Sequence, residues 1–180
     1  MVRHPSPLDG RRAQSIPGFD IPGPTTMPLT DLVAQNGILP ALKVTGKKQA
    51  LQELAAKAAE LVGLPERGIY EVLLQREKLG STAVGNGIAI PHGKLARLDH
   101  LFGLFARLER PIDFESLDGQ PVDLIFLLLA PESAGADHLK ALARVARLLR
   151  DPEIAGKLRE SRDVDAIYAV LAMPPASTAA

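Results

Sequence analysis

The sequence predicts an α/β fold in which helices cover both faces of a mixed β-sheet. Segments with apolar residues at helical spacing stand both before and after a central group of strands. The strand expected over 122–129, VDLIFLLL, is apolar on both faces, which is typical of a central strand covered on each side. Its apolar run ends before Pro131 and is far shorter than the ~20 residues of a membrane-spanning helix. This order of elements therefore favours a sheet between two helical layers.

The expected helices are bounded by recognisable start and stop residues. Thr30 and Thr45 stand where N-cap residues would stand, and Gly63 and Gly80 follow the last apolar residue of a periodic segment. Pro65 suits the first turn of a helix. The helices are expected, in chain order, over 31–37, 46–62, 65–79, 136–150, 152–160 and 163–172. The strands are expected inside the stretch 85–94 (GNGIAIPHGK), over 101–108 and over 122–129.

Composition limits both the domain organisation and the possible functions. The chain has 180 residues, of which 21 are lysine or arginine and 21 are aspartate or glutamate. This length suits one domain with a sizeable core. Zero net charge argues against a general nucleic-acid binder or a protein that binds anionic membranes. The sequence has no cysteine, which excludes disulfides, thiolate metal ligands and a cysteine nucleophile.

The two ends of the chain differ from the middle. Residues 1–26 are rich in Pro, Gly and Ser and have no helical or alternating pattern, so we expect a disordered tail that buries too little apolar surface to fold. Periodicity begins at Met27, which suggests that Met27 is the natural start. We expect one domain over 27–173 and a frayed tail over 174–180. The first residues do not form a signal peptide, so we expect a cytoplasmic protein with no membrane insertion.

The glycine-rich stretch that follows the third expected helix does not form a nucleotide-binding motif. Gly80 and Gly85 have the separation of a P-loop, but Asn86 and Gly87 stand where Lys and Ser or Thr are required. A dinucleotide fingerprint fails as well, because Ile90 stands where Gly or Ala is required. The H-E-x-x-H zinc motif and the G-x-S-x-G nucleophile motif are also absent from the sequence. We therefore expect neither a cofactor nor a metal.

His92 is the strongest candidate for chemistry, because it lies between Pro91 and Gly93 at the end of an expected strand. Pro91 fixes its own φ, and Gly93 allows another chain to approach closely, so the imidazole can be presented at a surface. Imidazole can act as a base, as a metal ligand or as a nucleophile that accepts a phosphoryl group. The local pattern leaves these roles open beside a purely structural role in the turn.

Two further polar residues share the apolar face of an expected helix. Arg76 is in phase with Ile69, and no acidic residue stands three or four positions from it, so it either neutralises a bound anion or serves the helix C-terminus and solvent. His138 is in phase with Leu142 near a helix N-terminus. It is either a packed core residue or a neutral donor to a phosphoryl group on His92. A metal site would require both histidines and a carboxylate to converge, and no spacing supports this.

The stretch REKLGSTAVGNGIAIPHGK, residues 76–94, closely resembles the phosphorylation-site signature of enzyme IIA of the fructose/mannitol class. This enzyme belongs to the bacterial phosphoenolpyruvate-dependent phosphotransferase system. The resemblance extends from about residue 29 to residue 171 and includes QPVD at 120–123 and HL at 138–139. It is greatest to the nitrogen-related branch of the family. It implies the fold of that family, a mixed sheet flanked by helices.

The resemblance also implies roles for three residues. His92 matches the phosphoryl acceptor, which receives the group from the phosphohistidine of HPr or of an HPr-like paralogue. His138 matches the second active-site histidine, and Arg76 matches the arginine that interacts with the phosphohistidine. The scheme requires no cofactor or metal. For the nitrogen-related branch the resemblance implies regulated targets such as potassium-transport and kinase systems.

Three functions stay open at this point. The first is a phosphohistidine carrier that regulates target proteins through its phosphorylation state. The second is a sugar-specific IIA component that passes phosphate to a fructose- or mannitol-type IIB, and the third is a regulatory module that only binds. Because a partner must bring its phosphohistidine to His92, we expect an apolar rim there, for which Ile88, Ile90 and Leu95 are the candidates.

Overall fold

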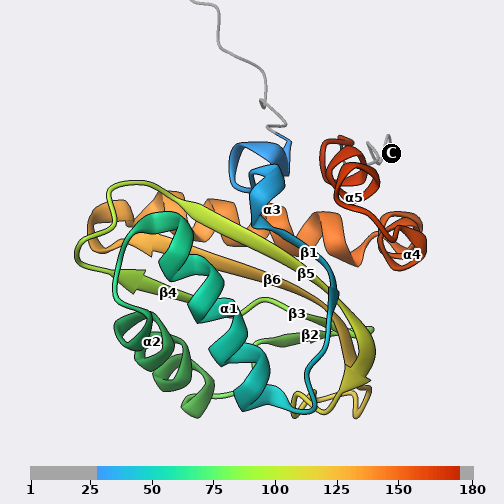
Figure 1. The fold of residues 1–180 in the computed structure, drawn as a ribbon, viewed down its shortest axis with the longest axis horizontal. Coiled ribbons are helices and arrows are strands. Elements are labelled where there is room, and N and C mark those ends of the chain that lie inside the picture. Colours follow the sequence, from blue (N-terminus) through green and yellow to red (C-terminus); the bar gives the residue numbers. More distant parts are fainter. Residues whose placement is uncertain (1–27, 175–180) are drawn as a thin grey trace, which may run out of the picture.

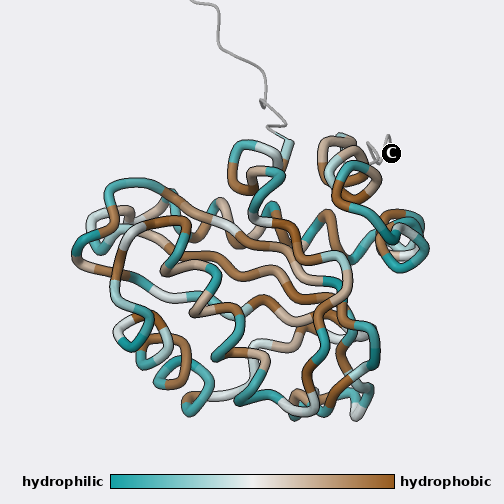
Figure 2. Tube along the Cα trace, in the orientation of Figure 1, coloured by the Kyte–Doolittle hydropathy of each residue, from teal (hydrophilic) through white to brown (hydrophobic). Residues whose placement is uncertain are grey.

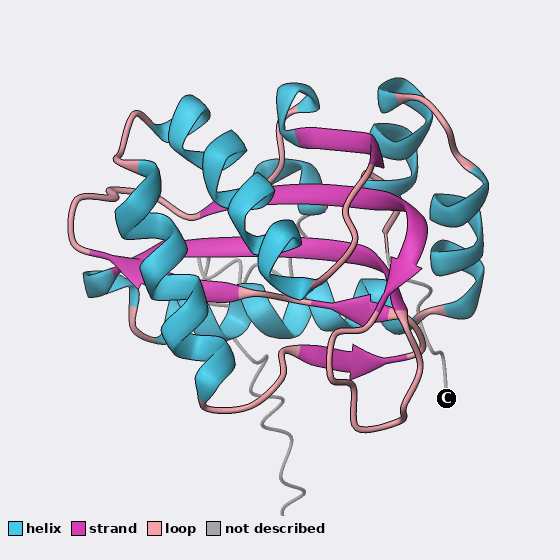
Figure 3. Ribbon diagram, turned by 60° about the horizontal axis from the view of Figure 1, so that its bottom comes forward, coloured by secondary structure: helices cyan, strands magenta, loops and turns pink. Residues whose placement is uncertain are grey.

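Six strands form one mixed sheet in the computed structural model, which describes residues 28–174 (Figures 1 and 3). The tails expected over 1–26 and 174–180 lie outside the described residues, apart from Pro174. The sheet order is β1-β5-β6-β3-β2, and β4 pairs with β6 beyond the end of β3. The β5–β6 and β2–β3 pairs are antiparallel and the other pairs are parallel. The strands are β1 Ile38–Leu42, β2 Ala83–Gly85, β3 Ile88–Ala89, β4 His92–Leu95, β5 Phe102–Ile112 and β6 Val122–Pro131.

Helices cover both faces of this sheet, as the sequence predicts (Figure 3). Helices α1 and α2 pack on one face, and α3, α4 and α5 pack on the other. Within the part of the chain that the structure describes, no helix is long and apolar enough to cross a membrane. The helices are α1 Lys47–Val62, α2 Glu66–Lys78, α3 Ala136–Arg150, α4 Pro152–Glu160 and α5 Val164–Leu171, each within one residue of its predicted bounds.

Strand β6 explains why the sheet has two apolar faces. Its side chains alternate between the two helical layers, because successive residues of a strand point to opposite sides. Leu124, Phe126 and Leu128 belong to the core beneath α3, α4 and α5. Their neighbours in the sequence, among them Ile125 and Leu127, belong to the core beneath α1 and α2. Figure 2 shows the same distribution, with hydrophobic residues along the central strands and hydrophilic ones on the outer surfaces of the helices.

The predicted helix over 31–37 is wrong. The chain instead makes two short 3₁₀ helices, Leu29–Asp31 and Gln35–Gly37, and then enters strand β1. A segment of seven residues is too short to sustain an α-helix without strong tertiary support. Here the carbonyl of Leu32 accepts a hydrogen bond from the backbone N–H of Gly103 at 2.8 Å, so the segment is tied to β5. Strand β1 escaped prediction because it contains a proline, which is tolerated at the edge of a sheet.

The stretch 85–94 forms parts of three short strands where the sequence predicts one. Asn86 and Gly87 both have positive φ, 57° and 78°, and make the tight turn between β2 and β3. An Asn-Gly pair suits such a turn because both residues tolerate the left-handed region. Strands β3 and β4 then run parallel to β6, and Pro91 between them accepts a hydrogen bond from the N–H of Leu128 at 2.9 Å. His92 is therefore the first residue of β4.

Candidate functional site

The imidazole of His92 has a hydrogen-bond partner at each ring nitrogen. Its Nδ1 lies 2.8 Å from the carbonyl oxygen of Ile90, and its Nε2 lies 3.3 Å from Nε of Arg76. A carbonyl oxygen only accepts and an arginine N–H only donates. The two contacts therefore select one tautomer, in which Nδ1 carries the proton and Nε2 carries the free electron pair. The nucleophilic nitrogen of His92 faces Arg76.

Arg76 lies in the last turn of α2 and is half-buried. Besides the contact with His92, its Nη1 donates a hydrogen bond to the carbonyl oxygen of Gly80 at 2.9 Å. The geometry thus agrees with a role at the helix C-terminus, and the role of Arg76 toward a bound anion stays a prediction. The guanidinium serves a carbonyl just beyond the end of its own helix, and it also points a positive charge at the imidazole.

His138 lies in the first turn of α3 and is only 6% exposed. Its ring centroid is 5.7 Å from that of His92, with 57° between the ring planes. Its Nε2 is buried and has no hydrogen-bond partner among the described residues. Three residues that are far apart in the sequence, Arg76, His92 and His138, are therefore brought together at one place.

Both histidines are held in the neutral form by their surroundings. Burial lowers the pKa of His92, and the positive charge of Arg76 lowers it further, against the opposing effects of the Ile90 carbonyl and the Glu77 carboxylate. Burial also lowers the pKa of His138, followed by repulsion from His92 and Lys94. A neutral imidazole can act as a nucleophile through one nitrogen and donate a hydrogen bond through the other. No group of three His, Asp or Glu side chains able to hold a metal ion occurs within residues 28–174.

A cavity of about 360 Å³ opens beside these residues. It contains His92 and Arg76 and is otherwise lined mainly by the segment 81–84 and by one face of α3. A larger cavity of about 520 Å³, next to Lys47 and Glu115, is lined by no histidine. We assign the site to the smaller cavity because it alone of the two is lined by a histidine.

The predicted apolar rim is correct for only one of its three members. Ile88 and Leu95 are 1% and 9% exposed and belong to the core, because their strands pair with β6, whereas Ile90, although only 2% exposed, lines the cavity. The exposed apolar side chains near the site are instead Leu79 and Leu139, which are 84% and 66% exposed. Leu79 follows the helix that carries Arg76, and Leu139 follows His138 and lines the cavity. The clue in the sequence was their position next to the site residues.

Gly93 allows a close approach, but the element that approaches is helix α2 of the same chain. A Cβ atom added to Gly93 would lie 2.3 Å from Cγ1 of Val72, one turn before Arg76. The glycine thus lets α2 pack directly on β4. This packing keeps the arginine within reach of the histidine.

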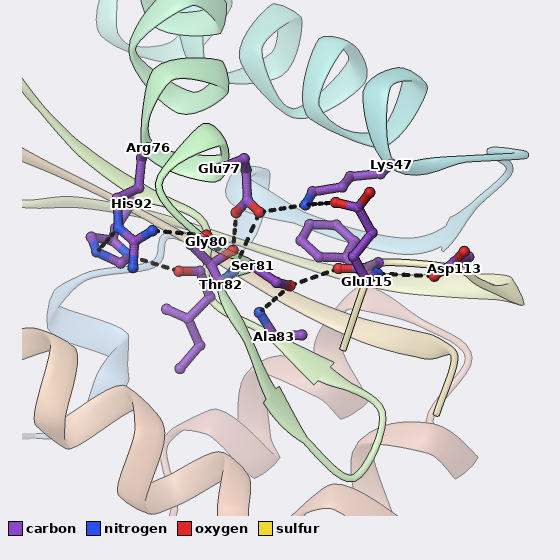
Figure 4. A network of polar contacts seen from close by, with 12 residues as sticks. Lys47, Arg76, Glu77, Gly80, Ser81, Thr82, Ala83, His92, Asp113 and Glu115 are labelled. Carbon is purple, nitrogen blue, oxygen red and sulfur yellow. Dashed lines mark hydrogen bonds and ion pairs between the residues drawn. The ribbon is translucent and has the colours of Figure 1, made fainter. Parts of the chain in front are cut away.

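A buried acidic residue, Glu77, also lies beside the site and was missed by the sequence analysis (Figure 4). Its carboxylate contacts Lys47 and Thr82. The signal that could have found it is its phase, because Glu77 follows Leu73 by four residues and so shares the buried face of α2.

Comparison with known proteins gives consistent results. The family described as "Phosphoenolpyruvate-dependent sugar phosphotransferase system, EIIA 2" matches residues 31–173. A nitrogen regulatory protein of Bradyrhizobium diazoefficiens is 77% identical over 153 residues, which cover 85% of this chain and 100% of that protein. The nitrogen regulatory protein of Escherichia coli K12 is 40% identical over 149 residues, covering 82% of this chain and 91% of that protein. The crystal structure of nitrogen regulatory protein IIA-Ntr from Neisseria meningitidis matches with a TM-score of 0.76 at 34% identity, covering 79% of this chain and 98% of that one.

Proposed function

Because the chain belongs to the EIIA 2 family of the phosphoenolpyruvate-dependent sugar phosphotransferase system, we propose that it is a phosphohistidine carrier with Nε2 of His92 as the acceptor. The observation that carries this proposal is the fixed tautomer of His92, with Nδ1–H bonded to the Ile90 carbonyl and Nε2 directed at Arg76. A neutral imidazole with its electron pair at the more open nitrogen is ready to attack phosphorus.

The transfer exchanges one N–P bond for another. The electron pair of Nε2 forms a bond to phosphorus, while the N–P bond of the donor's phosphohistidine breaks and its electron pair returns to the donor ring. His92 keeps the proton on Nδ1, so its ring becomes positively charged as the group arrives. The carbonyl of Ile90 stabilises that charge, because its hydrogen bond strengthens when the donor is ionised.

The neighbouring side chains stabilise the charge on the phosphoryl oxygens, which is the main demand of this reaction. Arg76 exchanges its contact with Nε2 for a contact with a phosphoryl oxygen. His138 donates a hydrogen bond from its buried Nε2, which has no partner within residues 28–174. The N-terminus of α3, where His138 lies, adds a favourable dipole for the incoming anion.

The partner that fits this scheme is an HPr-like phosphocarrier protein. The exposed Leu139, which lines the cavity, and the exposed Leu79, at the end of the helix that carries Arg76, offer it apolar contacts. The named relatives are nitrogen regulatory proteins, which favours a carrier that works in the cytoplasm and regulates targets through its phosphorylation state. Potassium-transport and kinase systems are the target classes that we propose.

The deciding experiment is incubation with enzyme I, an HPr-like protein and labelled phosphoenolpyruvate. We expect one acid-labile phosphate per chain, and none on His92→Ala. The matched control is His100→Ala, which changes an exposed histidine outside the cavity and leaves labelling intact. ¹⁵N-coupled ³¹P spectra should place the phosphorus on Nε2. An unlabelled wild-type protein, or a labelled His92→Ala protein, overturns the proposal.

The same assay separates the two other functions that the sequence left open. Addition of a fructose- or mannitol-type IIB protein should leave the label on this chain if it is a regulatory carrier. Rapid loss of the label to IIB would instead identify a sugar-specific component. A module that only binds would take no label from the donor at all.

A further inference from the structure

We propose that Glu77 is a positioning residue for phosphoryl transfer, acting through the contacts that hold Arg76 and His92; this inference rests on the proposed function. Glu77, Lys47 and Thr82 form a buried group that we call the Glu77 cluster (Figure 4). Thr82 lines the 360 Å³ cavity of the site, whereas Glu77 and Lys47 line the larger cavity, so Glu77 does not reach the site directly. Its effect is exerted through the loop that follows α2.

The carboxylate of Glu77 is fixed by three donors. Its side chain is 3% exposed, and Oε2 lies 2.7 Å from Nζ of Lys47, which reaches it from the first turn of α1. Oε2 also accepts a hydrogen bond from the backbone N–H of Thr82 at 3.2 Å, and Oε1 accepts one from the Thr82 hydroxyl. A charge buried this deeply requires such partners. Both oxygens are therefore engaged, and Thr82 has little freedom to move.

Thr82 is the link between this cluster and the acceptor histidine. While its N–H and hydroxyl face Glu77, its carbonyl oxygen accepts a hydrogen bond from the N–H of Ile90 at 3.0 Å. Ile90 in turn supplies the carbonyl that holds Nδ1 of His92. The backbone hydrogen bond to Thr82 thus positions Ile90, whose carbonyl selects the tautomer of His92 with the free electron pair on Nε2.

Arg76 is held from the same loop. Its Nη1 bonds the carbonyl of Gly80, two residues before Thr82 and within the loop whose far end Glu77 fixes. The contacts form a closed circuit from Arg76 to Gly80, along the chain to Thr82, across to Ile90, on to His92 and back to Arg76. Glu77 follows Arg76 directly in the last turn of α2. The same helical turn therefore holds Gly80 through Arg76 and Thr82 through Glu77.

Replacement of a whole buried ion pair by apolar residues is often neutral or stabilising, so stability alone does not account for a carboxylate at this position. Its neighbours on the buried face of α2, Ile69 and Leu73, are apolar. The carboxylate fixes the orientation of Thr82, because it accepts hydrogen bonds from both the N–H and the hydroxyl of that residue. Misplacement of a reacting group by ~1 Å can lower a rate by ~100-fold.

The test compares Glu77→Gln with Glu115→Gln. Both variants remove a carboxylate that pairs with Lys47, but Glu115 is 75% exposed and its bond of 3.0 Å to Lys47 does not involve Thr82. We expect Glu77→Gln to slow labelling by the phosphorylated donor by ~10- to ~100-fold, and Glu115→Gln to change it less than ~2-fold. The ¹⁵N spectrum of His92 supplies the second readout. Glu77→Gln should mix the two neutral tautomers, whereas Glu115→Gln should leave Nδ1 protonated.

A second pair of variants keeps the test valid if Glu77→Gln fails to fold. Thr82→Val removes the hydroxyl at nearly constant size, and Thr82→Ser keeps it. Slowed transfer with tautomer mixing in Thr82→Val, and recovery of both in Thr82→Ser, support the positioning role. Reduced stability with unchanged transfer rate and unchanged His92 spectrum shows that Glu77 is only structural. If the wild type takes no label, the proposed function fails, and the ¹⁵N comparison still tests the cluster.

Discussion

The two histidines of the site have opposite surroundings. His92 stands at the start of a strand with a hydrogen-bond partner at each ring nitrogen. His138 lies 5.7 Å away, between ring centroids, in the first turn of a helix, and its buried Nε2 has no partner among the described residues. The ring of His92 is thus oriented by its partners, whereas one nitrogen of the second ring has no partner among the described residues.

This difference has an energetic meaning. A buried polar group without a partner costs ~1–3 kcal/mol of stability. The protein tolerates that cost at His138, where a phosphoryl oxygen would supply the missing acceptor. Donors fixed in advance where charge develops are an effective form of catalysis, because they need no reorganisation during the reaction. The comparison predicts that substitutions near His92 disturb the orientation of its ring and of Arg76. Removal of the His138 imidazole should instead raise the stability of the protein and lower the rate of phosphoryl transfer.

The largest effect is expected for Arg76→Ala. It removes the donor that faces Nε2 of His92, and loss of one such charge-stabilising donor slows a reaction by ~100-fold or more. We expect transfer from the phosphorylated donor to slow by about that factor, with a folded protein by circular dichroism. The control is Arg67→Ala, at the exposed start of the same helix, which should transfer at the wild-type rate. Equal rates for the two variants would contradict the role of Arg76.

Gly93→Ala tests the packing that brings Arg76 to His92. The new Cβ would lie 2.3 Å from Cγ1 of Val72, so α2 must move away from β4. Overpacking of this kind costs ~1–3 kcal/mol in the free energy of unfolding, measured by denaturant titration. Transfer should slow as well, because the shift carries Arg76 with it.

Two further variants test whether the contact with Val72 causes the effect of Gly93→Ala. Adding Val72→Ala should restore much of the stability by vacating the space. Gly68→Ala, on the same helix with open space around it, should be neutral or stabilising by ~0.5–1 kcal/mol. A Gly93→Ala protein as stable as the wild type would show that the close contact of α2 with β4 is not needed.

The features that could be predicted from the sequence are those determined by residues close together in the chain. The two-faced strand β6 and the stops at Gly63 and Asp151 follow from residues close together in the chain. The same is true of the apolar phase of Arg76 and His138, which placed both side chains on the sheet side of their helices. The three candidate residues could therefore be listed from the sequence, with their roles implied only by the family resemblance, whereas the distances between them could not be predicted.

What could not be predicted depends on pairing between distant segments. Ile88 was a candidate for the rim because the sequence does not show that its strand, β3, pairs with β6 in the core. Arg76 lacked an acidic partner on its helix, and its partners are a carbonyl and a histidine 16 residues away. Glu77 was overlooked because its ion-pair partner, Lys47, comes from another helix.

His138→Leu tests the other half of the comparison. Leucine removes the unpartnered Nε2 at similar size, so the unphosphorylated protein should become more stable by ~1 kcal/mol. Transfer should slow at the same time, because the donor held for the phosphoryl group is lost. Denaturant unfolding and the labelling assay measure the two effects. A loss of stability would show that the buried imidazole is satisfied in solution, and that the difference between the two histidines is smaller than the geometry indicates.

The smallest effect is the pH dependence of stability. Burial lowers the pKa of both histidines from the usual value of about 6.5, so the unfolded chain binds more protons than the folded protein between the lowered values and 6.5. Stability therefore rises with pH across that window. The contribution is complete above pH 6.5 and is lost as the pH falls towards the lowered pKa values.

His138→Leu removes one of the two groups, so its unfolding free energy should fall less than that of the wild type between pH 7 and pH 5. Phosphoryl transfer should fall over the same range, because protonation of Nε2 of His92 removes the electron pair that attacks phosphorus. An equal or steeper fall in the stability of His138→Leu would place the charged form of His138 at no disadvantage in the fold, and the repulsion from His92 and Lys94 would then have no measurable effect on stability.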